Sequence, residues 1–510
     1  MWIADNSMKN QIVRLTLFTA TIILFLCNLS RDYSWDVMER ACFLKYPSEA
    51  PAWGLFFFAH LLEIPLAAGL GRLLPLVSEP VVLLQILECF FGALLVLLLY
   101  DFCVAITGGL LLPLLVAGIL PASFGFWRMA TAGEEKVLAA FFITLFLYLF
   151  MLYPRDERAR KTTPRAPALC VGFVLGLASL AHLMALILWP FVLIVIVLKR
   201  WGLKGLRFGI GDSIVIALVG LIIFVSVVAI IAVFYYGLHS PQEILKGLLT
   251  YHSPRFPFWY FAQPAQYRSL LGNLRKSVIG MERVIFPDGV VNRHARGMAL
   301  LIAPVLLCTI IAALKHARKN PLIPLFTVFL ILWACTYLFY EPRNPESWIC
   351  AYPPFLLLVC TLATTSRPAS RRLTTSAFLV ALSLLLLVNS RYYGALRLPG
   401  PLELCARALD ATVPRGAVIV VGDGLEQRYI RYFSHRELML SDHLQSGKFD
   451  WFDTGRINAQ EFRIRLNEGR PVYATALGLK RLPASLRSDL QWERVVYGRG
   501  VNLYRLKAGR

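Results

Sequence analysis

Long apolar runs with few charged residues recur along the chain as far as residue 391, and they constrain the fold more than any other feature. Many approach or exceed the roughly 18 residues that an α-helix needs to cross a bilayer. Hydrophobic residues make up 57% of the chain, more than the roughly 45–50% of a soluble domain. We predict a polytopic α-helical membrane protein with about eleven transmembrane helices, near residues 11–29, 80–100, 107–126, 136–153, 168–181, 183–198, 212–235, 298–315, 322–340, 348–365 and 374–391.

Positive charge in the short loops orients these helices. The formal net charge is +21, and the basic loops all fall on one side of the membrane if the spans alternate. Since cytoplasmic loops carry the excess of Lys and Arg, we expect a multi-pass protein of the cell (inner) membrane with its N-terminus cytoplasmic and its C-terminus extracytoplasmic. Topology thus explains the charge, and no nucleic-acid partner is expected. The four basic loops are 155–165, 199–207, 315–320 and 366–372.

The same topology places several loops at the outer face. The first contains residues 51–74, an apolar stretch that His60, Glu63, Pro65 and Arg72 interrupt. Counting this stretch as a span would reverse the side of every later loop, so an interfacial helix along the outer surface fits better. The predicted outer loops are 30–79, 127–135, 236–297 and 341–347.

The chain changes character near residue 395, where apolar runs give way to polar sequence. We therefore divide it into a transmembrane domain, residues 1–394, and a small extracytoplasmic α/β domain, residues 395–510. The sequence "VGDG" contains one Gly-x-Gly after a strand, which favours an ordinary turn over a phosphate-binding loop. The expected elements are a strand in 416–424, a helix in 425–435, a strand in 471–477 and a hairpin in 493–506.

Two aspartates follow the first predicted span, in "LCNLSRDYSWDVMERACFL" (26–44). Asp32 and Asp36 would share one face of a helix, because side chains four residues apart are neighbours there. Two readings are open: solvated surface charge, with Asp36 paired to Arg40, or a general base or metal ligand at the outer membrane surface. Near a low-dielectric boundary a carboxylate binds protons and cations more readily than in water.

The order of spans and loops resembles that of the GT-C superfamily of integral membrane glycosyltransferases. This group includes the dolichyl-phosphate-mannose protein mannosyltransferases and the bacterial aminoarabinose transferases. The resemblance covers about residues 10–365 and begins with an N-terminal span, an acidic outer loop and an interfacial helix. It continues through "ECFFGALLVLLLYDF" (88–102), "GILPASFGFWRMATAGEEKVLAAFFITLFLYLF" (118–150) and "VGFVLGLASLAHLMALILWPFVLI" (171–194).

The resemblance implies a GT-C-like fold and an inverting hexosyl- or pentosyltransferase. Such an enzyme moves a sugar from a polyprenyl-phosphate or dolichyl-phosphate carrier to an acceptor hydroxyl at the outer face of the membrane. Its partners would be this lipid-linked donor, membrane lipids and a lipid, glycan or protein acceptor. The chemistry requires a base for the hydroxyl, cationic groups for the leaving phosphate and an apolar groove for the prenyl tail.

The resemblance also assigns roles to acidic residues. The family's first-loop acid matches Asp36 or Asp32, and we favour Asp36 because "WDVMERA" has the Asp-then-Arg-Ala spacing common there. The Asp-Glu pair of the protein mannosyltransferases is lacking, so the acceptor class stays open. Glu134 and Glu135 match a second acidic position, although a capped helix start would equally favour Glu. The cofactor is not fixed by the sequence; if a divalent cation takes part, Asp32 and Asp36 would be its ligands.

Four basic residues are candidates for binding the donor phosphate. His182 interrupts two apolar runs at the outer boundary, where polar residues are costly and usually functional; the alternative is a structural histidine. Arg128 precedes the two glutamates and would otherwise anchor a lipid headgroup. Arg343 lies in "YEPRNPESW"; the alternative is a tight connection held by Arg–Glu pairing. Arg255 lies in the long outer loop 236–297, which is rich in aromatic residues.

Two functions without covalent chemistry compete with this hypothesis. A transporter or lipid flippase tends to place polar residues near the bilayer midplane and to contain inverted repeats. Here the charged residues gather at the outer boundary, and no internal repeat is evident. A membrane scaffold that presents the tail domain would tolerate substitution of the aspartates and of His182.

Overall fold

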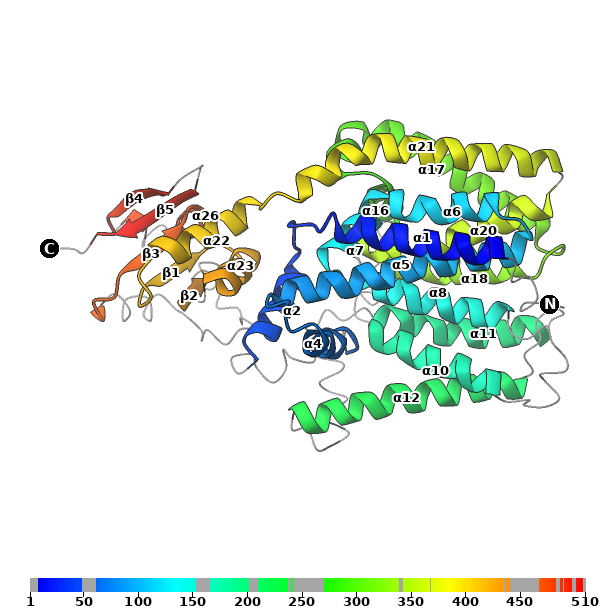
Figure 1. Cartoon of the computed structure of the whole chain (residues 1–510), viewed down its shortest axis with the longest axis horizontal. Helices are drawn as coiled ribbons and strands as arrows, with labels where there is room; N and C mark the ends of the chain where they lie inside the picture. Colours follow the sequence, from blue (N-terminus) through cyan, green and yellow to red (C-terminus); the bar gives the residue numbers. More distant parts are fainter. Residues whose placement is uncertain are drawn as a thin grey trace. The chain divides into compact units, whose positions relative to one another are not determined.

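Helices account for most of the chain, and a five-stranded sheet lies in its C-terminal part (Figure 1). This computed structural model describes residues 8–47, 61–152, 166–200, 210–236, 240, 242, 270–338, 343–366, 368–434, 437–440, 467–482, 487–488, 490–497 and 501–507. The chain divides into two compact units. The first comprises Met1–Leu29, Phe56–Gly69 and Gln85–Ala395, and the second comprises Ser30–Leu55, Leu70–Leu84 and Leu396–Arg510.

The first unit is built from helices that bury one side and expose another. Phe329 and Trp333 are fully buried, whereas Leu221 and Leu387 are exposed, as expected of helices whose outer surface contacts lipid. In chain order the helices are α1 (Met8–Leu26), α4 (Glu63–Leu73), α5 (Pro80–Thr107), α6 (Leu111–Ala122), α7 (Phe124–Ala132), α8 (Lys136–Leu152), α10 (Ala166–Ala181), η1 (Leu183–Ile187), α11 (Leu188–Arg200), α12 (Ile210–Tyr236), α16 (Leu270–Ile285), α17 (Asp288–His316), α18 (Leu322–Tyr337), α19 (Glu346–Ile349), α20 (Tyr352–Thr365) and α21 (Pro368–Leu396); α4 and α5 extend into the second unit at one end.

The predicted spans coincide with helices of this unit, which confirms a polytopic helical membrane protein. Among the described residues, five helices are long and apolar enough to cross a bilayer, and a bent pair, α6 with α7, makes up to six. Other apolar helices have only 10–17 residues, so the count of about eleven spans stays a prediction. The five long helices are Met8–Leu26, Pro80–Thr107, Gly211–Phe234, Glu346–Thr365 and Ser370–Thr412.

The helical path breaks at two points that matter for the site. The expected span 107–126 bends by 62° between α6 and α7. Pro121, inside the last turn of α6, has no N–H to continue the helix, and the Ser123 hydroxyl donates to the Ile119 carbonyl at 2.8 Å. The second break is at His182, which separates α10 from η1 and α11.

Small residues let α10 and α12 pack closely. A Cβ at Gly172 would lie 2.7 Å from the carbonyl oxygen of Ile216, and one at Gly176 would lie 2.7 Å from the Ile223 side chain. On the facing helix, a Cβ at Gly220 would lie 3.0 Å from Leu175. Glycines four residues apart allow two membrane helices to approach through their backbones.

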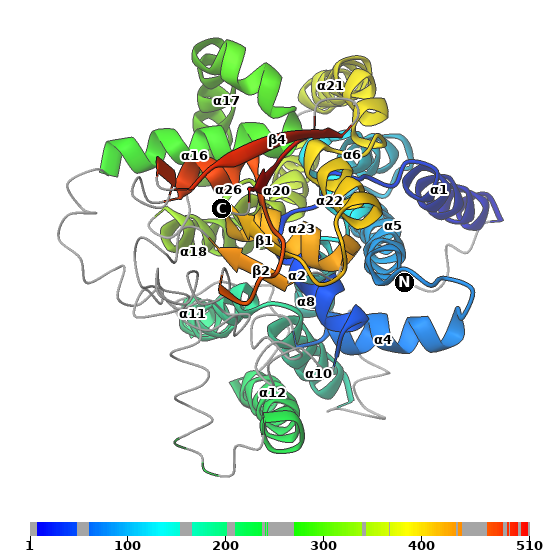
Figure 2. The ribbon, with the colours of Figure 1, turned by 90° about the vertical axis from the view of Figure 1, so that its left-hand side faces the viewer.

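The second unit contains a mixed sheet (Figure 2). Its strands are β1 (Val418–Val421), β2 (Glu437–Leu440), β3 (Val472–Thr475), β4 (Trp492–Tyr497) and β5 (Val501–Leu506), in the order β2-β1-β3-β5-β4. The first three strands in this order are parallel and the last two are antiparallel to their neighbours. The two strands, the helix and the hairpin predicted for the tail are thereby confirmed. The helices of this unit are α2 (Trp35–Lys45), α22 (Pro401–Thr412), α23 (Gly424–Ser434) and α26 (Ala476–Arg481).

The "VGDG" segment is a packed turn between β1 and α23. A Cβ at Gly422 would lie 2.3 Å from Leu477, and one at Gly424 would lie 2.1 Å from the Trp35 ring. The Gly422 N–H, which a phosphate loop would leave for a ligand, donates to the Glu426 carboxylate at 2.6 Å. Both glycines therefore make room for side chains, which favours the turn reading.

The glycine contacts predict how the bundle responds to one added methyl group. Gly172→Ala should destabilise the protein by about 1–3 kcal/mol, because the obstacle is backbone and the helices must move apart. Gly211→Ala is the matched control on α12, since no atom lies within 4 Å of that position; it should be neutral or stabilising. Thermal unfolding in detergent measures both, and equal melting temperatures for the two variants would contradict the packing.

Candidate active site

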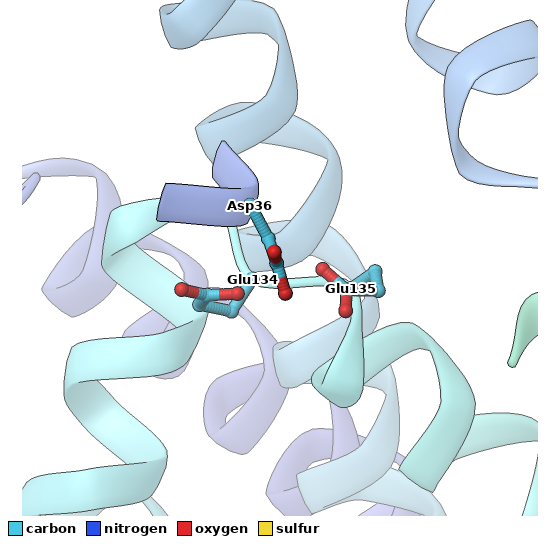
Figure 3. Close-up of side chains that lie close together, drawn as sticks. All are labelled: Asp36, Glu134 and Glu135. Atoms are coloured by element: carbon cyan, nitrogen blue, oxygen red, sulfur yellow. The ribbon is translucent and has the colours of Figure 1, made fainter. Parts of the chain in front are cut away.

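Glu134 and Glu135 lie in a tight turn between α7 and α8. Helix α7 ends at Ala132, and Gly133 takes a left-handed conformation with φ of 88°, which is the common way for glycine to terminate a helix. The Glu134 N–H then donates to the Met129 carbonyl at 3.0 Å. Figure 3 shows both glutamates at this turn and Asp36 on the first turn of α2.

Helix α5 anchors both sides of this turn. The Gln85 amide donates to the Thr131 carbonyl at 2.6 Å, near the end of α7. The Glu88 carboxylate accepts the N–H of Leu138 at 2.8 Å, in the first turn of α8. A buried carboxylate at a helix N-terminus satisfies a donor that has no partner within the helix and suits the helix dipole. The turn is thus held by side chains from a neighbouring helix.

A network of buried charged groups lies beside the turn. Lys136 and Glu135 form an ion pair. The Lys136 ammonium lies 3.8 Å from the Glu346 carboxylate, and His182 Nε2 lies 3.9 Å from the Glu135 carboxylate. The exposed fractions of Glu135, Lys136 and His182 are 0%, 4% and 8%. Because burying charge inside a membrane bundle is costly, these four residues form the strongest candidate site in the first unit.

His182 has a structural role as well as a place in this network. It caps η1, and its Nδ1 accepts the N–H of Met184 at 3.0 Å. An acceptor role for Nδ1 leaves the proton of the neutral ring on Nε2, the nitrogen nearer Glu135. The structural alternative is thus observed, and contact with a carrier phosphate stays a prediction.

The two aspartates differ in their surroundings within the second unit. Ser34 caps α2 by accepting the Val37 N–H at 3.3 Å, and Asp36 follows in the first helical turn, where the helix dipole favours negative charge. Asp36 is half-buried, whereas Asp32 is exposed and precedes the helix. A shared helical face required a helix through both aspartates, and the Ser34 cap starts the helix after Asp32.

The remaining candidates are three arginines. Arg128 is half-buried on α7, Arg343 is exposed before α19, and Arg255 lies outside the described residues. Lys136 was not among the residues predicted from the sequence. The available signal was a lysine directly after two glutamates, at the first residue of the predicted span 136–153.

Two known enzymes with solved structures share this fold across nearly the whole chain. ArnT from Cupriavidus metallidurans with bound undecaprenyl phosphate is 12% identical, with 98% of each chain covered and a TM-score of 0.63; its apo state gives 0.64. The archaeal oligosaccharyltransferase AglB from Archaeoglobus fulgidus, in complex with an inhibitory peptide and a dolichol-phosphate, is 12% identical with a TM-score of 0.53, covering 98% of this chain and 74% of that one. No family model and no curated protein matches the sequence.

At this identity the likeness concerns the fold. The resemblance to the GT-C superfamily, predicted from the order of spans and loops, is thereby confirmed at the level of the fold. The match extends over 98% of the chain, so it includes the C-terminal residues as well as the helices. It does not test the roles of individual residues.

The buried ion pair predicts a specific stability effect. Lys136→Met should lower the thermal stability strongly, because removing one partner of a buried pair costs roughly 3–5 kcal/mol. Adding Glu135→Gln should restore part of the loss, since the fully buried side chain at residue 135 then carries no uncompensated charge. Lys9→Met, which removes an exposed lysine on α1, is the matched control. A Lys136→Met protein as stable as this control would show that the pair contributes nothing to folding.

Proposed function

We propose that this protein is a membrane glycosyltransferase that moves a sugar from a polyprenyl-phosphate or dolichyl-phosphate carrier to an acceptor hydroxyl at the outer face of the membrane. The observation that carries the proposal is the network of the buried Glu135, Lys136 and His182 with the half-buried Glu346. A bundle that only had to fold would not need two acids and two basic groups among apolar helices.

The fold supports the choice of donor. ArnT, with the same fold, was solved with undecaprenyl phosphate bound, and AglB was solved with a dolichol-phosphate. Both ligands join a long isoprenoid tail to a phosphate. A chain of apolar helices with buried cationic groups suits such a carrier, because the tail requires apolar surface and the phosphate requires positive charge.

The reaction requires one base and one anion-binding group. A carboxylate takes the proton of the acceptor hydroxyl, the hydroxyl oxygen bonds to the anomeric carbon, and the bond from that carbon to the carrier phosphate breaks. The bonding electrons leave with the phosphate, whose negative charge increases. Attack opposite the leaving group inverts the anomeric configuration. Cationic side chains near the phosphate stabilise this developing charge.

We assign Asp36 as the base, with Glu134 and Glu135 on the turn between α7 and α8 as further acidic candidates. Carboxylates of this kind would also suit a divalent cation, which prefers oxygen ligands. Such a cation would help to neutralise the leaving phosphate. Asp32 is the weaker candidate because it is exposed and precedes α2.

We assign the phosphate to Lys136 and His182, with Arg128 as a further candidate from the preceding helix. Lys136 supplies an ammonium group, and its burial strengthens the electrostatic interaction of that group with an anion. His182 supplies a donor at Nε2, because its Nδ1 is occupied by the cap of η1. Arg343 and Arg255 stay predictions from the sequence.

Replacing the proposed base should abolish turnover and leave carrier binding intact. Asp36→Asn keeps the shape of the side chain but cannot take a proton at neutral pH, so turnover should fall by about 10²–10⁴-fold. Turnover is read as polyprenyl phosphate released from a total lipid extract of the source cells. Binding of undecaprenyl phosphate is measured separately and should not change.

Asp32→Asn is the matched control and should have a smaller effect. If added divalent cation restores turnover to Asp36→Asn, the aspartate is a metal ligand rather than the base. If Asp36→Asn turns over normally, the base must be sought at Glu134 or Glu135. If the unmodified protein releases no polyprenyl phosphate and only moves lipid across the membrane, it is a flippase and the proposal fails.

Replacing His182 should separate its two roles. Asn retains a side-chain acceptor suited to a helix N-cap, so His182→Asn should preserve the cap of η1 and remove the Nε2 donor. Undecaprenyl phosphate should then bind about tenfold or more weakly, because a hydrogen bond to a charged group is worth about 1.5–3 kcal/mol. His182→Ala should lose thermal stability as well. Unchanged carrier affinity in His182→Asn would make the residue structural.

A further inference from the structure

The segment that carries Asp36 packs on the tail of the same unit from its first residues. The Arg31 side chain pairs with Glu403 of α22, with Nε 3.1 Å from a carboxylate oxygen, and the Arg31 N–H donates to the Leu396 carbonyl at 2.7 Å. Tyr33 and Tyr429 exchange two hydrogen bonds: the Tyr33 N–H donates to the Tyr429 hydroxyl at 3.0 Å, and that hydroxyl donates to the Tyr33 carbonyl at 3.1 Å.

The middle of the segment is held by one arginine. The Arg428 guanidinium stacks on the Trp35 ring at 3.6 Å from its centroid and lies 3.3 Å from the Glu39 carboxylate. The Trp35 indole N–H donates to the same carboxylate oxygen at 3.1 Å. Arg428 Nη1 also donates to the Gly424 carbonyl at 2.8 Å. One planar cation thus fixes two side chains of α2 to the start of α23.

The end of α2 is held by Tyr432, which lies on α23 as Arg428 does. Lys45 lies over the Tyr432 ring at 4.2 Å from its centroid, and its ammonium donates to the Tyr432 carbonyl at 3.1 Å. The Tyr432 hydroxyl in turn donates to the Glu79 carboxylate at 2.6 Å. Helix α2 is therefore attached to α23 along its whole length.

This attachment matters because α2 cannot hold its own conformation. It has 11 residues, and isolated helices shorter than about 12–15 residues are marginal in water. In the sequence, Asp36 lies between Trp35 and Glu39, two residues of α2 that Arg428 contacts. The rotation of α2, and with it the direction of the Asp36 carboxylate, therefore depends on Arg428.

We propose that the tail domain is a positioning device for the reaction, in which Arg428 acts through Trp35 and Glu39 to fix the orientation of Asp36. This proposal rests on the proposed function, because it takes Asp36 as the base. It gives the α/β domain a role in turnover without contact between Arg428 and the substrate. Burial raises the pKa of the Glu39 carboxyl above its ordinary value; the charge of Arg428 opposes this shift, and the nearby Asp36 adds to it.

The test uses the full-length protein with two independent variants. Arg428→Met keeps the volume of the buried stem and removes the stack and the ion pair. Trp35→Leu removes the stack from the other side, and because Trp35 is 43% exposed, it is less prone to misfold. Arg494→Met is the matched control, since that arginine is exposed on β4 and donates from Nε to Asn502 Oδ1 of β5 at 3.0 Å.

Three readouts are compared: hydrogen exchange of the α2 amides, polyprenyl phosphate released from a total lipid extract, and binding of undecaprenyl phosphate. Both variants should speed amide exchange in α2 and lower turnover at least tenfold, with carrier affinity unchanged. In the Asp36→Asn background, Arg428→Met should add less than a threefold further loss, because the positioning of Asp36 no longer matters once the base is gone. The control should match the unmodified protein in all three.

Two results would overturn the proposal. One is amide hydrogen exchange in α2 as slow as in the unmodified protein, both in Trp35→Leu and in the folded fraction of Arg428→Met. The helix would then be held in place without this arginine. The other is multiplication of the Arg428→Met and Asp36→Asn losses, which would show that the two residues act independently. Normal turnover in Asp36→Asn alone is a different failure: it rejects Asp36 as the base, while hydrogen exchange still reports whether Arg428 orders α2.

Discussion

The Glu135–Lys136 ion pair is the interaction on which the candidate site depends. Both side chains are buried, and burying either charge without the other would cost several kcal/mol of folding free energy, about 3–5 kcal/mol for one lost partner. Holding them requires the Gly133 turn, the α5 side chains that anchor its two ends, and the Glu346 carboxylate from α19. The path of the chain between α7 and α8 is therefore set by electrostatics as much as by apolar packing.

The break at Ser123 serves the same arrangement. Helix α7 departs from the direction of α6 by 62°, and its C-terminus delivers the acidic turn to the helices that supply His182 and Glu346. Residues 281–285 of α16 pass close to α7, because a Cβ at Gly125 would lie 2.6 Å from the Arg283 carbonyl oxygen. The site is thus built where short helices meet, rather than along the long spans.

The sequence predicted what depends on local composition. Apolar runs indicated the helices, and runs of β-branched residues such as Val418–Val421 indicated the strands, because both patterns repeat over a few residues. Glu135 and His182, both singled out from the sequence, lie near each other in the structure. Lys136 was missed because its importance comes from burial beside Glu346, more than 200 residues away, and no local pattern reports such a contact. The tail contacts of α2 were missed for the same reason: Tyr33 and Tyr429 are 396 residues apart.

Gly424 has a consequence for how this protein can be recombined. The Trp35 ring occupies the space that any side chain at residue 424 would need, and Arg428 reaches the same ring from one helical turn later. Residues 30–46 and the tail are consequently complementary surfaces that lie far apart in the sequence. A chimera that imports a foreign tail must import residues 30–46 with it, even though the unaltered residues 47–394 would separate the two grafts.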